Sequence, residues 1–493
     1  MENNSWLVKV VTSDYLKLVP ILGLAFYLAS ITHQGYPYLV HLDEWVHLAC
    51  SNEIIKGATA FGLTDPFRGG TPIHNQLLEV GFHVFWAVFH QISGISWLDI
   101  FKYFPGIVFM VTVLSVYILA QRQGFGWEAA LLTCLIPTTV GILGPGLLVP
   151  VAMGLLFIAL SLFVAFTFKS RWSYLVLFIF SAFLLSMHAA TAVGLIIILI
   201  PYIVLNLKGN FKHSLGVTLA ITTPFLAALV AVPSIWALVA REVPRLLVQQ
   251  SIPHFIQIPV VIETYGYLPV LLCLAGTLLL VMRGGIKNYA LTLGLLVLLS
   301  MLAIYYVFGY GVGMMYYRGL QYAMLMMSIV AGAGLMAVKN LKLPEGFIAR
   351  LKAPPIMRNV GPILCLILIG LTLYIAIPTR QDAPYYRMID DEDYRAFVWI
   401  RDNVGSSYQK AVLDPWKGTA FTAITGKNVY TWIGERARAS DEEAYKFLRD
   451  GSEDTAFLKN NGISIVYTEK SVNNPDLVEV RKHVYLLKEA GSQ

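Results

Sequence analysis

Two histidines and two adjacent carboxylates lie within the seven residues HLDEWVH, from His41 to His47. The segment directly follows the first long apolar run of the chain, at the edge of a potential membrane span. A carboxylate that apolar neighbours partly desolvate holds a proton more tightly, and a second carboxylate beside it strengthens this effect. Such a group can take a proton from a hydroxyl. Asp43 is therefore a candidate general base, with Glu44 beside it.

Two other interpretations of this segment stay open. A zinc-binding H-E-x-x-H motif needs two histidines four residues apart on one helical face, and DEWVH fails at the first of them. A mixed site for a divalent metal, made of His41, Asp43 and His47, is an alternative. The third interpretation is a helix that begins at Asp43, with acidic residues in its first turn. That helix would place His47 one turn away, near Asp43.

The composition of the chain predicts a helical membrane protein. Of its 493 residues, 57% are hydrophobic and 13% are charged, whereas soluble domains carry about 25% charged residues. Residues 1–378 hold 12 of the 30 acidic residues, and residues 379–493 hold the other 18. We therefore expect a transmembrane domain over 1–378 and a soluble domain over 379–493. The net charge of +6 is modest, and we expect no nucleic-acid partner.

Eleven apolar runs are long enough to cross a membrane as helices. A twelfth, 76–93, carries Gln76, Glu79, His83, His90 and Gln91, which is costly for a lipid-facing span. We predict that it lies in the membrane interface as an amphipathic helix, within a large outer loop over 34–100; a twelfth span is the alternative. The eleven runs are 16–33, 101–120, 127–143, 147–168, 172–187, 189–207, 216–240, 267–282, 289–308, 319–338 and 360–378. The first is expected to be a retained span, because no A-x-A-like cleavage site precedes it.

The charges of the connections predict the topology. With the N-terminus inside and 76–93 in the interface, the connections rich in Lys and Arg all fall on the inner side. If 76–93 crossed, every later basic connection would lie outside. Eleven spans place the soluble domain on the outer face, together with HLDEWVH. The basic connections hold Arg122, Lys169, Arg171, Lys208, Lys212, Arg283, Lys287, Lys339, Lys342, Arg350, Lys352 and Arg358.

The soluble domain has the pattern of an α/β fold. Helical spacing over 394–404 precedes the short apolar run KAVLD (410–414). A polar helix over 440–450 precedes two more apolar runs, ISIVYT (463–468) and HVYLLK (483–488). Strands that alternate with helices predict a small, largely parallel sheet.

The whole layout resembles the GT-C superfamily of membrane glycosyltransferases. These enzymes have a first span, a large outer loop that opens with an acidic pair, interfacial helices and then many more spans. The Asp43, Glu44 and His47 pattern is similar to the acidic loop motif of protein O-mannosyltransferases, and GFHVFWAVFHQISGIS after Pro72 resembles the juxtamembrane helix of these enzymes. QRQGFGWEAALL resembles their inner loop after the second span. The chain lacks the WWD motif of oligosaccharyltransferases and has DPWKG at 414–418 instead.

The resemblance implies a sugar donor linked to a polyprenyl phosphate, and transfer with inversion on the outer face. Asp43 would deprotonate the acceptor hydroxyl, with Glu44 as a second catalytic carboxylate and with His41 and His47 as substrate-binding residues. A cation would hold the departing phosphate, because negative charge develops there in the transition state.

Arg318 is the first candidate for this cation. It opens the tenth span from the outer side, and it is the only basic residue between positions 287 and 339. Superfamily members often carry an arginine at a comparable late-span position, and Tyr317 beside it is expected to contact the substrate. The alternative role for Arg318 is snorkelling to the membrane interface.

Four further residues are weaker candidates. Arg241 and Arg245 are second choices for binding the phosphate. His188, at an outer turn between two spans, predicts a polar cavity because a histidine is costly to bury in lipid; it could also cap helix carbonyls. Glu263 could join Asp43 in binding a divalent metal, as an acidic residue of a late outer loop does in oligosaccharyltransferases. No cofactor is otherwise expected.

The sequence therefore predicts a multi-pass cell-membrane glycosyltransferase with an extracytoplasmic C-terminal domain. Its expected partners are a polyprenyl-phosphate-sugar donor, membrane lipid, and a glycan, lipid or protein acceptor. Transfer of an oligosaccharide to protein is one alternative. A non-enzymatic lipid or solute transporter is another, although transporters usually show inverted repeats and ionisable residues at mid-span, and neither is evident here.

Overall fold

The computed structural model describes residues 14–57, 64–69, 79–232, 234–249, 258–342, 360–382, 385–434 and 438–488. The chain divides into two compact units. The first comprises Met1–Gln34 with Tyr103–Pro384, and the second comprises Gly35–Lys102 with Tyr385–Gln493. The segment between the first two apolar runs therefore folds with the C-terminal part of the chain.

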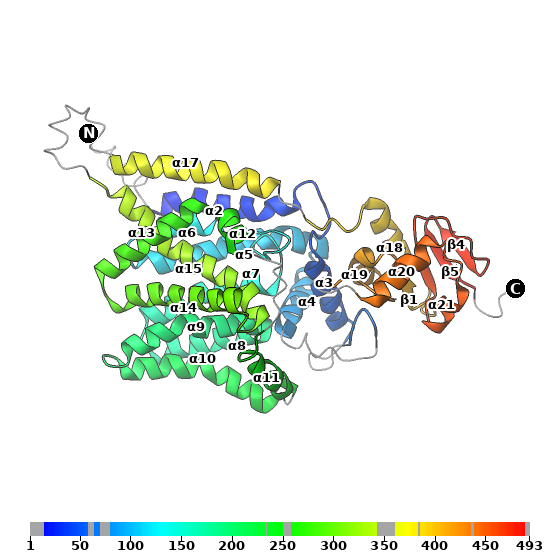
Figure 1. Cartoon of the computed structure of the whole chain (residues 1–493), viewed down its shortest axis with the longest axis horizontal. Helices are drawn as coiled ribbons and strands as arrows, with labels where there is room; N and C mark the ends of the chain where they lie inside the picture. Colours follow the sequence, from blue (N-terminus) through cyan, green and yellow to red (C-terminus); the bar gives the residue numbers. More distant parts are fainter. Residues whose placement is uncertain are drawn as a thin grey trace. The chain divides into compact units, whose positions relative to one another are not determined.

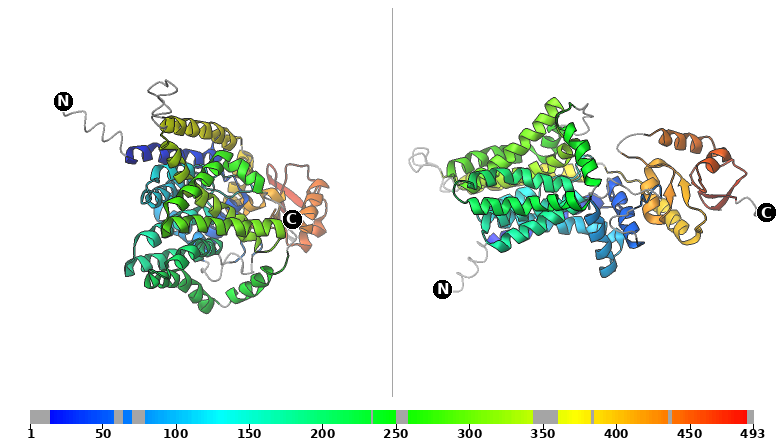
Figure 2. Two further views of the ribbon diagram at one scale, coloured as in Figure 1. Left: turned by 60° about the vertical axis from the view of Figure 1, so that its left-hand side comes forward. Right: turned by 90° about the horizontal axis from the view of Figure 1, so that it is seen from below.

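The first unit is a bundle of apolar helices that lie side by side (Figures 1 and 2). In the described part of the chain, eight helices are long and apolar enough to cross a membrane, and α8 and α13 are shorter apolar helices of 17 residues. These ten helices coincide with ten of the eleven predicted spans, and the chain is an integral membrane protein. Together with the shorter helices α6, α11 and α12, they are α2 (Asp14–Ser30, continued by η1, Ile31–His33), α5 (Trp97–Gln121), α6 (Gly126–Thr133), α7 (Pro150–Thr167), α8 (Arg171–Met187), α9 (Ala189–Asn206), α10 (Phe211–Ala231), α11 (Ser234–Arg245), α12 (Ile258–Tyr265), α13 (Tyr267–Arg283), α14 (Ile286–Phe308), α15 (Gly313–Lys339) and α17 (Val360–Gln381).

The prediction of a helical span over 127–143 is wrong. Only its first part is helical, as α6, and the backbone over 134–149 is irregular. Pro137 lacks the N–H that a helix needs, and several glycines follow it. Irregular backbone at membrane depth must satisfy its polar groups within the protein. Accordingly, the Thr138 Oγ1 accepts a hydrogen bond from the Gly146 N–H at 2.7 Å.

Glycines allow α13 and α15 to approach closely. A Cβ at Gly276 would lie 2.0 Å from the Val330 carbonyl oxygen, and a Cβ at Gly334 would lie 2.0 Å from the Leu272 carbonyl oxygen. Larger side chains at these positions would force the helices apart. Membrane helices commonly use small residues in this way, because packing rather than water exclusion holds them together.

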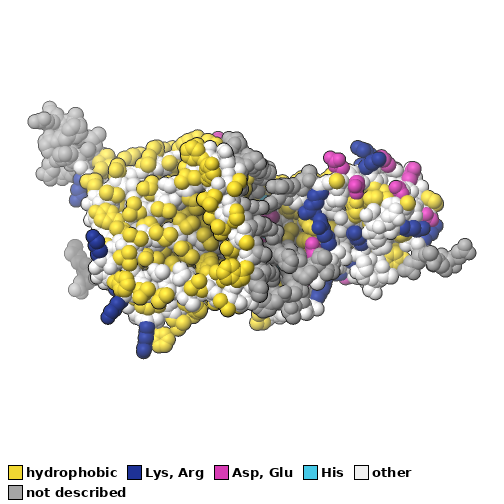
Figure 3. Space-filling model, turned by 60° about the horizontal axis from the view of Figure 1, so that its bottom comes forward, with side chains coloured by type: hydrophobic (Ala, Val, Ile, Leu, Met, Phe, Trp, Pro, Cys, Tyr) yellow, Lys and Arg dark blue, Asp and Glu magenta, His cyan; other side chains and the backbone are white. Residues whose placement is uncertain are grey.

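The surface of the first unit is suited to lipid. Figure 3 shows hydrophobic side chains spread over the whole face of this unit, with a few Lys and Arg side chains gathered at one end. Leu226 of α10, Leu278 of α13 and Leu371 of α17 are each more than half exposed. An apolar surface of this extent marks contact with a membrane or a partner.

The second unit joins α3 (Leu42–Ile55) and α4 (Val80–Ser93) to the C-terminal segment. α3 packs on α4 and on α19 (Gly418–Thr425), and the Asn52 side chain of α3 donates a hydrogen bond to the Ala423 carbonyl at 3.0 Å. At 14 residues, about 21 Å, α4 is shorter than the roughly 30 Å hydrocarbon core of a bilayer.

The C-terminal segment contains a five-stranded sheet in the order β2-β1-β3-β5-β4. β1 pairs in parallel with β2 and β3, whereas β5 pairs antiparallel with β3 and β4. The prediction of a largely parallel sheet is therefore wrong, because β4 and β5 form a hairpin with a two-residue turn, a connection that only antiparallel strands allow. The elements are α18 (Asp391–Asn403), β1 (Lys410–Val412), η4 (Pro415–Lys417), β2 (Asn428–Val429), α20 (Ala439–Arg449), α21 (Thr455–Asn460), β3 (Ile465–Tyr467), β4 (Leu477–Arg481) and β5 (Val484–Leu487).

Candidate functional site

The segment HLDEWVH forms the start of α3. His41 is its N-cap residue, with extended backbone (φ −138°, ψ 147°), and the His41 Nδ1 accepts a hydrogen bond from the Asp43 N–H at 3.1 Å. Since Nδ1 accepts, a neutral His41 ring carries its proton on Nε2. The helix begins at Leu42, one residue before the start expected from the sequence.

Glu44 is fully buried in the first turn of α3. Its Oε2 accepts a hydrogen bond from the Val40 N–H at 3.1 Å. A carboxylate that reaches back over a helix N-terminus satisfies a backbone N–H and suits the positive end of the helix dipole. Glu44 therefore stabilises the start of α3.

Asp43 lies in the same turn, but its side chain is partly exposed. Burial raises the pKa of the Tyr386 hydroxyl, and the nearby Asp43 carboxylate raises it further. The Tyr386 ring centroid lies 5.3 Å from that of His41 and 5.4 Å from that of Trp416. Asp43 thus lies near residues from both chain segments of the second unit.

His47 pairs with a histidine of α4. Its Nδ1 lies 3.0 Å from the His83 Nε2, and both side chains are buried. Burial lowers the pKa of His83 to about 3, so this ring is neutral at physiological pH. His83, one of the polar residues of the predicted interfacial helix, therefore does not face lipid headgroups, because α3 covers this side of α4.

A second group of polar residues lies inside the first unit, and we name it the span cluster: His188, Thr191, Arg318 and Tyr322. The predicted chain turn is at His188, which joins α8 to α9. The His188 Nδ1 lies 2.6 Å from the Thr191 Oγ1, which lies 2.8 Å from the Tyr322 hydroxyl. Arg318 is close enough for its charge to act on His188. Two of the predicted residues therefore meet in one polar group within an apolar bundle, where polar and ionisable residues usually have functions.

Arg318 and Tyr317 lie in the first turns of α15, beside a stack of tyrosines. The Tyr316 ring is stacked on the Tyr305 ring of α14 at 5.0 Å and contacts the Tyr317 ring edge-on at 5.4 Å. Tyr305 and Tyr316 are buried. The stack fixes the junction of α14 and α15 and thereby the start of the helix that carries Arg318.

The weaker candidates fall outside both groups. Arg241 and Arg245 belong to α11, but their side chains lie outside the described residues. Glu263 lies on α12 with its side chain exposed. Among the described residues, no three His, Cys, Asp or Glu side chains gather as metal ligands.

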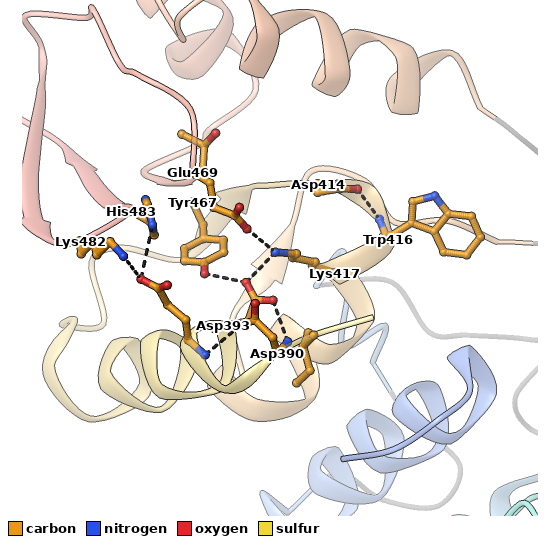
Figure 4. A network of polar contacts seen from close by, with 12 residues as sticks. Asp390, Asp393, Asp414, Trp416, Lys417, Tyr467, Glu469, Lys482 and His483 are labelled. Carbon is orange, nitrogen blue, oxygen red and sulfur yellow. Dashed lines mark hydrogen bonds and ion pairs between the residues drawn. The ribbon is translucent and has the colours of Figure 1, made fainter. Parts of the chain in front are cut away.

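Figure 4 shows a third polar group in the second unit, which we name the tail network. Asp393 of α18 accepts hydrogen bonds from the Lys417 Nζ at 2.7 Å, the Tyr467 hydroxyl at 2.6 Å and the Asp390 N–H at 3.0 Å. The Lys417 Nζ also donates to Glu469 at 2.8 Å. Burial alone would lower the pKa of Lys417, but the two carboxylates raise it above its usual value.

The tail network anchors the DPWK turn. The Asp414 side chain caps η4 by accepting a hydrogen bond from the Trp416 N–H at 3.0 Å. Lys417 is held in the network, whereas the Trp416 ring points away from it (Figure 4) and is 39% exposed. The turn therefore presents the Trp416 ring toward Tyr386 from a rigid base.

Sequence reasoning missed several residues of these groups. Thr191 and Tyr322 lie in apolar runs at positions where polar residues are uncommon, and their separations from His188 and Arg318, three and four residues, place each pair on one helix face. That spacing was the available signal. Tyr386 gave no signal, because its contact with His41 joins segments about 340 residues apart.

The comparisons with known proteins come from structure alone. No family model and no curated protein sequence matches the chain significantly. Among solved structures, the Archaeoglobus fulgidus oligosaccharyltransferase tethered with an acceptor peptide is similar with a TM-score of 0.64 and 12% identity, over 94% of this chain and 70% of that chain. ArnT from Cupriavidus metallidurans bound to undecaprenyl phosphate has a TM-score of 0.55 and 13% identity, over 98% of both chains. The mycobacterial arabinofuranosyltransferase AftD has a TM-score of 0.57 and 14% identity, over 94% of this chain and 37% of that one. At these identities the likeness shows the fold.

Proposed function

We propose, from the premise that the chain has the GT-C fold of membrane glycosyltransferases, that it is itself such an enzyme. It would move a sugar from a polyprenyl-phosphate donor to an acceptor, with inversion, on the extracytoplasmic face. Two similar structures support the classes of ligand. ArnT was solved with undecaprenyl phosphate, and the archaeal oligosaccharyltransferase was solved with a tethered acceptor peptide.

The observation that carries the proposal is the difference between the two carboxylates of HLDEWVH. Glu44 is buried and binds the Val40 N–H. Asp43 is partly exposed beside His41 and Tyr386. A ligand can reach a partly exposed carboxylate but not a fully buried one. Asp43 is therefore the carboxylate we assign as general base.

The proposed reaction gives each predicted residue a role. As the acceptor oxygen attacks the anomeric carbon, the Asp43 carboxylate takes the proton of the hydroxyl. The bond between the anomeric carbon and the phosphate oxygen breaks, and the lipid phosphate leaves with its electron pair. Arg318 would offset the negative charge that develops on this phosphate, with Tyr317 and His188 in the donor site. The His41 Nε2–H would donate a hydrogen bond to the acceptor.

The topology is part of the proposal. We place the C-terminal segment outside the cell and the Lys208 connection inside, because of the distribution of basic residues. The four native cysteines are buried, so they leave a low background for labelling. A membrane-impermeant thiol reagent should label Glu479→Cys, an exposed position of β4, on intact cells. It should label Lys208→Cys only after lysis, and the reverse pattern would refute the assigned orientation.

The function is tested by supplying the purified protein with undecaprenyl-phosphate sugars and candidate acceptors. Release of undecaprenyl phosphate that depends on an acceptor would support the proposal. A sequon peptide that serves as the acceptor would make the protein oligosaccharyltransferase-like. Movement of lipid or solute across reconstituted vesicles without release of lipid phosphate would establish the transporter alternative instead.

A further inference from the structure

Gln321 is a buried polar residue that the mechanism above does not use. It lies on α15, three residues after Arg318 and one before Tyr322, and its side chain is 1% exposed. Within the described part of the chain, neither the nitrogen nor the oxygen of its amide has a hydrogen-bond partner. A buried amide in this state destabilises the protein, and native structures contain few such groups.

Two neighbouring contacts define the side of α15 on which Gln321 lies. The Ser328 hydroxyl lies 3.1 Å from the Thr133 hydroxyl of α6, and a Cβ at Gly332 would lie 2.6 Å from the Ala129 Cα. α6 and α15 are thus antiparallel and in close contact. Residues seven apart share a helix face, so Gln321 lies on this face, about 10 Å beyond Ser328 and past the last residue of α6.

Arg318 and Tyr322 border this position. Arg318 lies one turn before Gln321, on the same side of α15. Tyr322 connects to Thr191 and His188 by hydrogen bonds. The unpartnered amide is therefore adjacent in the helix to the residues that we assign to the donor.

The chemistry of an amide limits its ligand. The side chain of glutamine offers an N–H₂ donor and a carbonyl acceptor together. An ionised phosphate only accepts hydrogen bonds, so it could satisfy the nitrogen but would leave the oxygen unpaired. Sugar hydroxyls both donate and accept, and a pair of them can satisfy both ends of the amide.

We propose that Gln321 binds hydroxyl groups of the sugar in the lipid-linked donor, while Arg318 binds its phosphate. This inference rests on the proposed glycosyltransferase function. Gln321 thereby distinguishes the glycosylated donor from the polyprenyl phosphate that remains after transfer, because the product leaves the buried amide without partners. The loss of these hydrogen bonds favours release of the product.

The test compares two lipids and two variants of the full-length protein in detergent. Dissociation constants are measured for undecaprenyl phosphate and for undecaprenyl-phosphate glucose, mannose and arabinose. Gln321→Met keeps the length of the side chain and removes both polar atoms. We expect it to weaken binding of the best-bound sugar lipid by about tenfold, and binding of undecaprenyl phosphate by less than about threefold. Gln321→Glu, which keeps only the acceptor, should also lose the preference for the sugar lipid.

A stability measurement separates this role from a structural one. Because the amide has no partner among the described residues, the Tm of Gln321→Met without ligand should equal or exceed that of the unsubstituted protein. A lower Tm with an unchanged preference would overturn the inference, and so would equal losses for both lipids. Ser161→Ala on α7, whose buried hydroxyl also lacks a partner among the described residues, is the matched control and should keep the preference.

Lipid binding by the unsubstituted protein distinguishes failure of the proposed function from failure of sugar recognition at Gln321. If it binds neither undecaprenyl phosphate nor any of the sugar lipids, the proposed function itself fails. If it binds undecaprenyl phosphate as tightly as the sugar lipids, sugar recognition at Gln321 is refuted while the phosphate site stands.

Discussion

The tail network and Gln321, which lies beside the span cluster, differ in whether a buried polar group has hydrogen-bond partners. Asp393 is 2% exposed and accepts hydrogen bonds from Lys417, Tyr467 and the Asp390 N–H. Gln321, beside the span cluster, is 1% exposed, and neither of its amide atoms has a partner among the described residues. Both side chains lose contact with water, but the described part of the chain supplies hydrogen-bond partners only for Asp393.

This difference separates groups that stabilise the fold from groups available to a ligand. A fully satisfied network rigidifies its surroundings, whereas an unsatisfied buried group lowers stability and is retained where function needs it. Glu44 and Asp43 differ in exposure instead: Glu44 is buried and binds a backbone N–H, whereas Asp43 is partly exposed. Substitutions in one class should change stability, and those in the other should change activity.

The largest expected effect is on turnover, at Asp43. Removing a positioned general base typically lowers the rate by about 10²–10⁴. Asp43→Asn is nearly isosteric, so we expect a rate loss of this order with an unchanged Tm. Glu44→Gln keeps an acceptor for the Val40 N–H and should lose less, and His41→Ala and His47→Ala should fall between the two. The measurement is turnover of each purified variant, with donor binding checked separately.

This experiment also tests whether the roles assigned to the two carboxylates should be exchanged. Near-normal turnover of Asp43→Asn with an inactive Glu44→Gln would exchange them. Normal turnover of both would reduce the motif to a helix start and break the contrast between these neighbours.

The second effect is on stability, at Asp393. Asp393→Ala leaves Tyr467 and one donor position of Lys417 without an acceptor in a buried setting. Breaking a buried charge pair costs about 3–5 kcal/mol, so we expect a clear fall in the unfolding temperature of the C-terminal segment, followed by limited proteolysis during heating. Donor binding below that temperature should persist.

An exposed ion pair provides the control for Asp393. Arg401 and Asp402 form a bidentate pair on α18 with both side chains about half exposed. Exposed pairs add little stability, so Asp402→Ala should leave the unfolding temperature unchanged. An equal loss in both variants would show that burial does not distinguish the tail network.

The third effect is on donor affinity, at Arg318. Hydrogen bonds to a charged group contribute about 1.5–3 kcal/mol, so Arg318→Ala should weaken undecaprenyl phosphate binding by about 10- to 100-fold. Arg318→Lys should recover part of the loss, because it keeps the charge and loses the bidentate geometry. The control is Arg283→Ala, at the C-terminal end of α13, which should bind undecaprenyl phosphate normally. Unchanged binding in Arg318→Ala would leave only the snorkelling role.

The sequence predicted those parts of the fold that depend on local pattern. Ten apolar runs became helices, and the turn at His188 was visible as the break in a run too long for one span. The prediction of a span over 127–143 was wrong because it relied on the high hydropathy of the segment and gave too little importance to Pro137. A lipid-facing helix and a buried irregular segment are equally apolar, so composition alone does not separate them.

The site was predictable only where its residues are close in sequence. The adjacent carboxylates Asp43 and Glu44 were visible as a pair in the sequence. Which of them binds a backbone N–H at the helix N-terminus depends on whether the helix begins at Leu42 or one residue later, and the sequence does not determine this. The contacts of His47 with His83 and of His41 with Tyr386 join distant segments. Such contacts follow from tertiary packing, which no local pattern in one sequence encodes.

The smallest expected effect concerns pH and Asp390, the N-cap residue of α18. Hydrogen bonds from the Asp393 and Glu392 N–H groups hold the pKa of Asp390 below its usual value of 3.8. A lowered pKa in the folded state stabilises the fold above the unfolded-state pKa, and this contribution is lost as the pH falls through the folded-state pKa. The difference in unfolding temperature between Asp390→Asn and the unsubstituted protein should therefore stay constant from pH 8 to about pH 5 and shrink below about pH 4.

Asn remains a good N-cap, so the difference is small throughout and comes from the charge alone. A difference that does not change with pH would mean that the cap acts through its hydrogen bonds only, and the tail network would then owe its stability to Asp393 and Lys417 without help from the helix start.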